Sequence, residues 1–309
     1  MYRSIIRLKD KFRLKYGMML YRNIFWFSQL FGFSLVRNRF YSPIPEIRTL
    51  KDKIWEYPSE LIGIKMNEKE QVILLSDFAE KYKIEYDQFQ LLKGSNTNPY
   101  DFYIKNRCFE EIDGEILYCM IRDLKPRKII EIGSGYSTYL SARATLKNKE
   151  NSDDCELIAI EPYPNETLKT GFPGLLKLLQ TEVQNVPLAK FLELQENDIL
   201  FIDSSHVLKI GSDVQYEYLE ILPRLNKGVV VHIHDIFLPA EYPKKWVLEE
   251  LMFYNEQYLL QAFLTFNDSF EILWSGSYMR LKHPDELKKA FNSYEKSTFP
   301  GSVWLRKIK

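Results

Sequence analysis

The most informative part of this 309-residue chain reads Ile130-Glu131-Ile132-Gly133-Ser134-Gly135-Tyr136-Ser137. It opens as an apolar run rich in β-branched residues, which is typical of a strand buried on both faces of a sheet. Gly133 and Gly135 then permit a sharp turn and a close approach of the backbone to a ligand. A helix starting near Ser137 would point its first N–H groups at a carboxylate or phosphate. The segment therefore predicts a strand, a ligand-binding turn and a helix, in that order.

Similar apolar runs continue along the chain and alternate with helical stretches. The predicted strands cover residues 128–132, 157–160, 199–202 and 229–233, and the clearest helices cover residues 137–146 and 211–222. This alternation predicts a doubly wound, mostly parallel α/β sheet of the Rossmann-like kind. Residues 258–266 and 270–279, separated by Asn267-Asp268-Ser269, are predicted to form a terminal antiparallel pair.

We expect three regions. Residues 1–50 form a basic extension that ends at Pro43 and Pro45, which remove backbone donors and favour extended chain. Residues 51–125 are predicted to form a helical lid or vestibule, with Asn67 and Asp113 as helix N-caps. Residues 126–309 form the ligand-binding core.

Charge and cysteine content narrow the functional classes. Lys and Arg balance Asp and Glu at 42 each, but the first 50 residues hold only Asp10 and Glu46 against ten basic residues, which are Arg3, Arg7, Lys9, Lys11, Arg13, Lys15, Arg22, Arg37, Arg39 and Arg48. The acidic remainder excludes nucleic acid as a partner of the core, since such binding needs clustered cations. The three cysteines are Cys108, Cys119 and Cys155 and show neither disulfide nor metal spacing, so a cytoplasmic location is expected.

Residues 18–35 are the most apolar part of the chain, yet Arg22, Asn23 and Gln29 interrupt them and they are too short to span a bilayer comfortably. Two interpretations stay open. Residues 1–40 contact an anionic membrane surface, at the inner face of the membrane, or a partner enzyme. Alternatively, the apolar face packs on the main domain or on a second subunit of a homo-oligomer.

The second predicted strand ends at Glu161, where an acidic side chain can accept hydrogen bonds from both hydroxyls of a ribose. A dinucleotide site would also need a small residue at position 138 for close packing of helix and strand. Thr138 stands there, which makes a nicotinamide dehydrogenase the weakest alternative.

The chain from Tyr41 onward resembles the bacterial class I S-adenosylmethionine (SAM)-dependent methyltransferases often labelled methyltransferase family 24. The matching stretches are Phe40-Tyr41-Ser42-Pro43-Ile44-Pro45, residues 130–137, Phe201-Ile202-Asp203-Ser204-Ser205-His206 and His232-Ile233-His234-Asp235-Ile236-Phe237. The resemblance implies a seven-stranded sheet and SAM as the cofactor. It places the methionyl part of SAM against Glu131, Gly133 and Gly135, the ribose on Glu161 and the adenine near residues 181–184, including Gln184. Ser134, Tyr136, Ser137 and Asp203 are also expected to bind the cofactor.

Two neighbouring strand ends carry residues that can ligate a metal or move a proton: Asp203 with His206, and His234 with Asp235. Similarity to sugar O-methyltransferases implies that Asp203 and Asp235 hold Mg²⁺ and that His206 is the base. Those relatives have a carboxylate where this chain has His234, and imidazole suits Mn²⁺, Fe²⁺ or Zn²⁺ better than Mg²⁺. A metal set of Asp203, His234 and Asp235, or His234 as the base, therefore stays open. His232 is expected to pack within its strand.

The predicted acceptor is a small molecule or glycan, and the predicted reaction is methylation of a hydroxyl on a sugar, a surface glycan or a glycosylated metabolite. Sugars and phenols bind against aromatic faces, which the segment from Tyr100 to Phe109 and residues 239–246 can supply, although core packing explains the first segment equally well. Two alternatives are a metal-dependent oxygenase on the same fold and a catalytically silent scaffold in a glycan-assembly complex.

Overall fold

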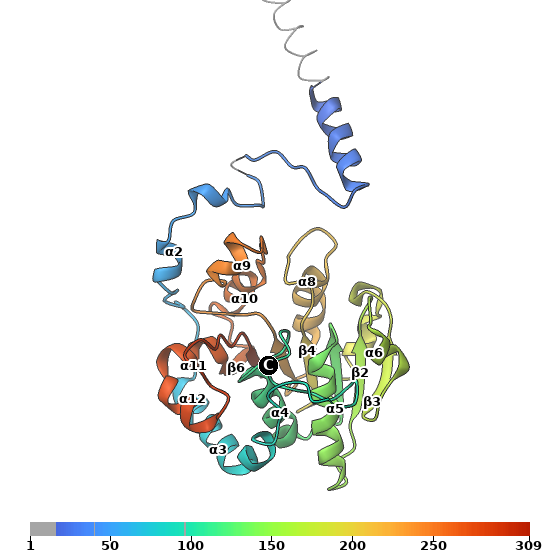
Figure 1. Cartoon of the computed structure of the whole chain (residues 1–309), viewed down its shortest axis with the longest axis vertical. Helices are drawn as coiled ribbons and strands as arrows, with labels where there is room; N and C mark the ends of the chain where they lie inside the picture. The colour runs from blue at the N-terminus through green and yellow to red at the C-terminus, as the bar shows by residue number, and fades with distance from the viewer. Residues whose placement is uncertain (1–16, 40, 96) are drawn as a thin grey trace, which may run out of the picture. The chain divides into compact units, whose positions relative to one another are not determined.

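Figure 1 shows the computed structural model of the chain, which describes residues 17–39, 41–95 and 97–309. The chain divides into two compact units, Met1–Lys51 and Asp52–Lys309. The described part of the first unit contains a helix over residues 17–29 and a 3-10 turn, η1 (Ile47–Thr49). The basic run from Arg3 to Lys15, and Phe40, lie outside the described residues. Within the described ranges, every helix is too short or too polar to cross a bilayer.

A seven-stranded sheet forms the centre of the second unit, in the order β3-β2-β1-β4-β5-β7-β6. The strands are β1 (Lys128–Ile132), β2 (Glu156–Ile160), β3 (Leu175–Leu179), β4 (Ile199–Ile202), β5 (Val230–Ile233), β6 (Phe270–Ser275) and β7 (Val303–Lys307). Strands β1 to β5 are parallel, and β7 lies antiparallel between β5 and β6. The predicted doubly wound, mostly parallel sheet is confirmed.

The central strands are buried on both faces, because helices cover the sheet on each side. All residues of β4 and β5 are buried, as are all of β1 except Lys128. This is why these strands are continuous apolar runs and do not alternate between apolar and polar residues. At the far edge, Trp274 of β6 and Trp304 of β7 pair with each other and are fully buried.

Helices α2 to α4 precede the first strand, and the later helices lie in the connections between strands (Figure 1). The helices are α2 (Lys53–Glu56), α3 (Glu68–Tyr86), α4 (Asp113–Leu124), α5 (Tyr136–Lys149), α6 (Glu166–Thr170), α7 (Leu188–Phe191), α8 (Asp213–Tyr216), α9 (Lys244–Leu248), α10 (Glu256–Leu264), α11 (Gly276–Lys282) and α12 (Pro284–Ala290). The β1-α5-β2 and β4-α8-β5 connections run in opposite directions along the sheet. Since such connections are right-handed, α5 and α8 cover opposite faces, and the strand order reverses between β1 and β4.

The predicted terminal antiparallel pair is wrong in its first member, and its second member, predicted over 270–279, ends at Ser275 where helix α11 begins. Residues 258–266 belong mostly to helix α10, and the antiparallel partner of β6 is β7. Leu260 and Leu264, four residues apart, are buried on one side of α10, which is helical spacing. A short apolar run does not distinguish a strand from a buried helix, and β3, a partly exposed edge strand, was not predicted.

Of the two predicted N-caps, Asn67 stands at the predicted position without capping the helix, and Asp113 does not stand at the N-cap position. Helix α3 begins after Asn67, but the Asn67 side chain makes no capping hydrogen bond and donates to the Ile272 carbonyl at 3.0 Å. Asp113 lies inside α4, and its carboxylate accepts hydrogen bonds from the Gly301 N–H and the Ser302 hydroxyl. Long-range partners therefore take both side chains. The predicted helix at 211–222 is broken into α8, a π turn η3 (Glu217–Ile221) and a 3-10 turn η4 (Leu222–Arg224).

Candidate active site

The carboxyl ends of β1, β2, β4 and β5 meet at one edge of the sheet. Backbone hydrogen bonds continue past the strand ends: the Gly133 N–H donates to Ile160, the Asp203 N–H to Ile132 and the His234 N–H to Ile202, at 3.0, 2.8 and 2.9 Å. The loops after these strands therefore start in register. Ligands of open parallel sheets bind at this edge where the strand order reverses, which here is between β1 and β4.

Gly133 brings the loops after β1 and β4 into direct contact. Its φ angle is +78°, a left-handed conformation that favours glycine. A Cβ atom at this position would lie 1.8 Å from the Asp203 carbonyl oxygen. Glycine is therefore required here by both the backbone conformation and the neighbouring chain.

Glu131 holds the glycine turn from beneath. Its side chain is completely buried, and its Oε1 accepts hydrogen bonds from the hydroxyls of Ser137 (2.5 Å) and Thr138 (3.0 Å). Thr138 in turn accepts the Gly135 N–H at 3.0 Å. Burial raises the pKa of Glu131 to about 8, against the opposing effect of the two hydroxyls. Thr138, which argued against a dinucleotide site, thus has a structural role in the turn.

We predict that Glu131→Gln changes the pH dependence of stability. The folded protein binds the Glu131 proton more tightly than the unfolded chain, so this group makes the free energy of unfolding fall as pH rises from about 4.5 to about 8. Glutamine keeps an acceptor for Ser137 and Thr138 and has no proton to lose. The variant should therefore lose less stability across this window in urea titrations at several pH values. Parallel curves for the two proteins would refute the assignment.

A cavity of about 460 Å³ opens at the same edge, a volume suited to a small-molecule cofactor. Its lining includes Gly133, Glu161, Gln184 and Asp203, four of the residues predicted to contact the cofactor. The others differ in position: Glu131 lies buried below the turn, while Ser134, Gly135, Tyr136 and Ser137 form the turn and the start of α5.

Glu161 borders this cavity and is prepared to accept hydrogen bonds. Its Oε2 accepts the Ser134 N–H at 3.1 Å and its Oε1 accepts the Tyr163 N–H at 2.8 Å. These bonds fix the carboxylate while leaving lone pairs on both oxygens. On another wall, Gln184 donates to the Gly211 carbonyl at 3.1 Å, and its own Oε1 is buried without a partner among the described residues.

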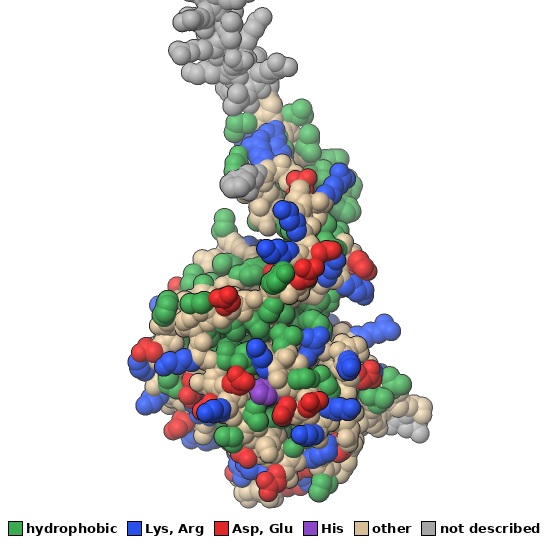
Figure 2. Space-filling view, turned by 90° about the vertical axis from the view of Figure 1, so that its left-hand side faces the viewer, with side chains coloured by type: hydrophobic (Ala, Val, Ile, Leu, Met, Phe, Trp, Pro, Cys, Tyr) green, Lys and Arg blue, Asp and Glu red, His purple; other side chains and the backbone are tan. Residues whose placement is uncertain are grey.

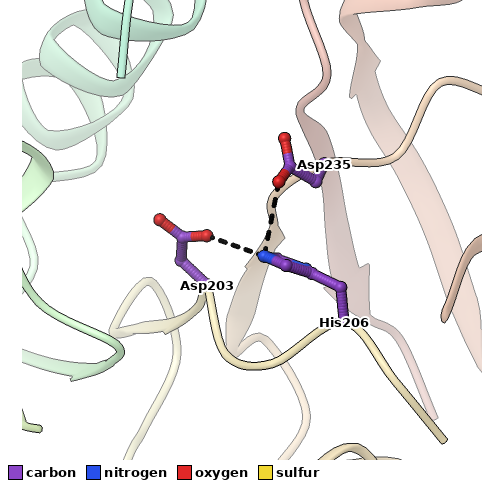
Figure 3. Close-up of side chains that lie close together, drawn as sticks. All are labelled: Asp203, His206 and Asp235. Carbon is purple, nitrogen blue, oxygen red and sulfur yellow. Dashed lines mark ion pairs between the residues drawn. The ribbon is translucent and has the colours of Figure 1, made fainter. Parts of the chain in front are cut away.

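Asp203, His206 and Asp235 converge beside this cavity (Figure 3). His206 Nε2 lies 3.2 Å from Asp203 Oδ1 and 3.4 Å from Asp235 Oδ2. His206 is buried, whereas about a quarter of the Asp203 side chain is exposed. Within the described ranges, this is the group of three side chains whose potential ligand atoms lie close enough together to hold one metal ion.

His234 does not join this cluster as the predicted metal set required. Its Nε2 is 3.9 Å from Asp235 Oδ1, beyond hydrogen-bond distance, and its ring packs against Phe109 with centroids 4.8 Å apart. The predicted metal set combined His234 with the two aspartates, whereas in the structure His206 is the histidine that lies between them. His232 is fully buried and stacks on Phe201 with centroids 4.0 Å apart, as expected of a strand histidine.

Two residues of the cluster have unusual backbone conformations. His206 and Asp235 have φ angles of +58° and +54°, in the left-handed region that few residues other than glycine adopt. Such strain persists only where the surrounding structure enforces it, and it is concentrated at functional sites. Here the backbone at His206 is fixed because the His206 carbonyl accepts hydrogen bonds from the N–H groups of Asn255 and Glu256 at 3.1 and 3.2 Å.

Glu256, at the start of α10, is a site residue that the sequence interpretation missed. Its carboxylate is fully buried, and Oε2 lies 2.9 Å from His206 Nδ1. Because a carboxylate only accepts, this contact assigns a proton to Nδ1 and directs Nε2 toward Asp203 and Asp235. Nothing in the sequence around Glu256 indicates this role, because the contact joins residues fifty positions apart.

The cluster is strongly acidic and therefore attracts positive charge. Burial opposes protonation of His206, but its bonds to Asp203 and Glu256 outweigh burial and hold its pKa well above the usual value. Burial raises the pKa of Asp203, yet His234 and His206 together hold it below the usual value. Burial and the neighbouring Glu256 hold the pKa of Glu217 well above normal. The space between the two aspartates thus suits a proton on Nε2 or a cation.

Aromatic side chains lie beside His206. Tyr254, which was not predicted, lies 4.9 Å from the His206 ring, and Trp246 lies 6.0 Å from Tyr254, measured between centroids; both are partly exposed. Within the segment from Tyr100 to Phe109, which was predicted to supply aromatic faces for the acceptor, Phe102 and Phe109 are buried core residues. Tyr103 is partly exposed and shares a 2.9 Å hydrogen bond with the Tyr136 hydroxyl.

Comparison with known proteins agrees with this geometry. Residues 130–236 match a family described as a methyltransferase domain. An uncharacterised protein of Archaeoglobus fulgidus is 33% identical over 168 residues, which cover 52% of this chain and 73% of that protein.

Three solved structures illustrate the more distant similarities. A putative methyltransferase from Thermobifida fusca is 13% identical, with a TM-score of 0.40, covering 88% of this chain and all of that one. The Bacillus cereus O-methyltransferase in complex with S-adenosylhomocysteine (SAH) is 12% identical, with a TM-score of 0.36, covering 76% of this chain and 90% of that one. The apo structure of CmcI is 16% identical, with a TM-score of 0.37, covering 65% and 72%.

The strand order, the glycine turn after β1 and the acidic residue ending β2 define a class I SAM-dependent methyltransferase. The matched domain lies on this part of the sheet and includes Gly133, Glu161, Asp203 and Asp235. The chain belongs to methyltransferase family 24.

Proposed function

We propose that this protein transfers the SAM methyl group to a hydroxyl oxygen of a sugar, either free, in a surface glycan or in a glycosylated metabolite. The observation that carries the proposal is the position of Asp203. Asp203 lines the cofactor cavity and also contacts His206. His206, which can accept a proton, therefore lies beside the space for the methyl donor.

The residues around the cavity fit SAM. Glu161 presents two fixed carboxylate oxygens to the ribose hydroxyls, and Gly133 leaves room for the backbone to approach the ligand. SAM, when bound, supplies the methyl group as an electrophile on a positively charged sulfur. The acidic surroundings, with Asp203 exposed to the cavity, favour that positive charge.

His206 is the proposed base. A neutral hydroxyl is a poor nucleophile, and removal of its proton as the carbon–oxygen bond forms lowers the barrier. The hydroxyl proton would pass to Nε2 in the form of the enzyme whose His206 is neutral, a form favoured at higher pH because the pKa of His206 lies well above the usual value. Glu256, at 2.9 Å from Nδ1, would stabilise the imidazolium that forms. Among the described residues, no hydrogen bond orients His234 toward Asp235, which favours His206 for this role.

The same residues fit a divalent cation. Asp203, Asp235 and Nε2 of His206 would hold it, and it would supply Lewis-acid polarisation of the acceptor oxygen in place of proton removal by His206, because a ligated Nε2 has no lone pair left for a proton. One imidazole and two carboxylates suit Mn²⁺ at least as well as Mg²⁺. The match of residues 130–236 to a methyltransferase domain favours methyl transfer over the oxygenase alternative.

The sugar acceptor rests on the partly exposed aromatic rings beside His206. Tyr254 and Trp246 offer faces for the apolar side of a sugar ring, and Asp235 offers an acceptor for its hydroxyls. Methyl transfer from labelled SAM should be measured on sugar nucleotides, oligosaccharides and phenols. Trp246→Ala should raise KM for the best acceptor about tenfold with little change in SAM affinity. Turnover of phenols alone would refute the sugar assignment.

We predict that SAM and SAH bind with micromolar affinity in calorimetry, and that Glu161→Ala weakens SAM binding at least about tenfold because two hydrogen bonds to a charged acceptor are lost. Glu166→Ala is the matched control, since Glu166 is exposed on α6 and pairs only locally with Lys169. Titrations with and without Mg²⁺ or Mn²⁺ test the cation. Equal loss in both variants, or no binding at all, would contradict the cofactor site.

A further inference from the structure

The described part of the N-terminal unit exposes a continuous apolar stripe. Leu20, Ile24, Phe27 and Phe31 follow one another at spacings of four, three and four residues, which places them on one side of the helix over residues 17–29 and the turn after it. Their exposed fractions are 62%, 45%, 62% and 63%. Arg22 and Gln29, seven residues apart, lie on the opposite side.

The chain then folds back along this helix and adds to the same kind of surface. The Phe33 N–H donates to the Ser28 carbonyl at 3.1 Å, and the Arg37 guanidinium lies 4.4 Å from the centre of the Tyr21 ring. Between these contacts, Phe33 and Leu35 are more than half exposed. Figure 2 shows apolar side chains together with Lys and Arg on this part of the chain.

Charge distinguishes between the surfaces that could cover these side chains. Residues 17–45 contain Arg22, Arg37 and Arg39 and neither Asp nor Glu, and the sequence before them adds six more basic residues against Asp10. A second copy packed on this face would bring like charges together, which is unfavourable. An anionic lipid surface complements the cations and accepts the exposed aromatic and aliphatic side chains at the same time.

We propose that residues 17–39 form an interfacial anchor that binds the surface of an anionic lipid bilayer. The stripe of Leu20, Ile24, Phe27 and Phe31 lies in the boundary between headgroups and acyl chains, and the arginines contact the lipid phosphates. The inference does not depend on the acceptor proposed above. A lipid-bound location would bring the methyltransferase close to acceptors carried on lipids.

Flotation of the full-length protein with lipid vesicles tests this proposal. We expect at least about tenfold stronger partitioning onto phosphatidylcholine vesicles containing about 30% phosphatidylglycerol than onto phosphatidylcholine alone. Raising the salt concentration to about 0.5 M should remove most of the difference, because the charges lie at the surface. Equal partitioning onto both vesicles, or onto neither, would overturn the proposal.

Two matched variants test the stripe without altering charge. Phe27→Ser combined with Phe31→Ser should weaken vesicle binding about tenfold or more, whereas Gln29→Ser, on the opposite side, should change it by less than about twofold. SAM affinity should be unchanged in both, which shows that the remainder of the protein is folded. If light scattering instead shows a dimer that only the phenylalanine variant dissociates, a second copy covers this face and the membrane proposal fails.

Discussion

Replacing His206 by alanine is expected to lower kcat by about 10³-fold, the contribution typical of a general base. The affinity for SAM should change little, because His206 is buried and does not line the cofactor cavity. Steady-state kinetics with the best acceptor and calorimetry with SAM measure the two effects separately. His283→Ala is the control, since His283 pairs with Glu68 on the surface, and it should retain full activity.

Glu256→Gln separates orientation of His206 from its charge. Glutamine can still accept the Nδ1–H, so the ring keeps its position while one neighbouring negative charge is lost. Since Glu256 helps to raise the pKa of His206, the acidic limb of the kcat profile should move to lower pH, and kcat should fall by about tenfold. The assignment of the base would be wrong if His206→Ala retained most of its activity while His234→Ala lost it.

Gly133→Ala is expected to destabilise the protein by more than about 3 kcal/mol and to abolish measurable SAM binding. The new methyl carbon would lie 1.8 Å from the Asp203 carbonyl oxygen, and the backbone would keep a φ angle of +78° that alanine rarely adopts. The loops after β1 and β4 must then separate, which displaces Asp203 from both the cavity and His206.

Gly135→Ala is the matched control for stability. Gly135 has an extended φ of −175°, and no atom of residues 17–39, 41–95 or 97–309 lies within 4 Å of its hypothetical Cβ. Its thermal unfolding midpoint should therefore stay close to that of the wild type, while the midpoint of Gly133→Ala falls by several degrees. A stable Gly133→Ala protein that binds SAM within about threefold of the wild type would show that the two loops need not touch for binding.

The local pattern of residues was sufficient to predict those site residues that lie directly at the ends of strands. The apolar runs located β1, β2, β4 and β5, and parallel strands bring their carboxyl ends to one edge, so Gly133, Glu161, Asp203 and Asp235 could be grouped from their positions alone. The same approach failed for α10, where apolar spacing over nine residues is compatible with either a helix or a strand.

Choosing between the two histidines needed coordinates. His206 and His234 both follow buried strands, and either imidazole could ligate a metal or accept a proton. The loop after β4 turns back with His206 in a left-handed conformation, which brings its ring between Asp203 and Asp235, while His234 remains packed against Phe109.

The sequence by itself determined the sheet, the glycine turn, the ribose-binding acid and the methyltransferase family, because these depend on residues that are neighbours along the chain or on adjacent parallel strands. Only the tertiary structure decided that His206 joins the two aspartates, that Glu256 orients it, and that Glu131 is buried beneath the turn. Each of these depends on contacts between side chains brought together by packing, whose geometry no local pattern of residues encodes.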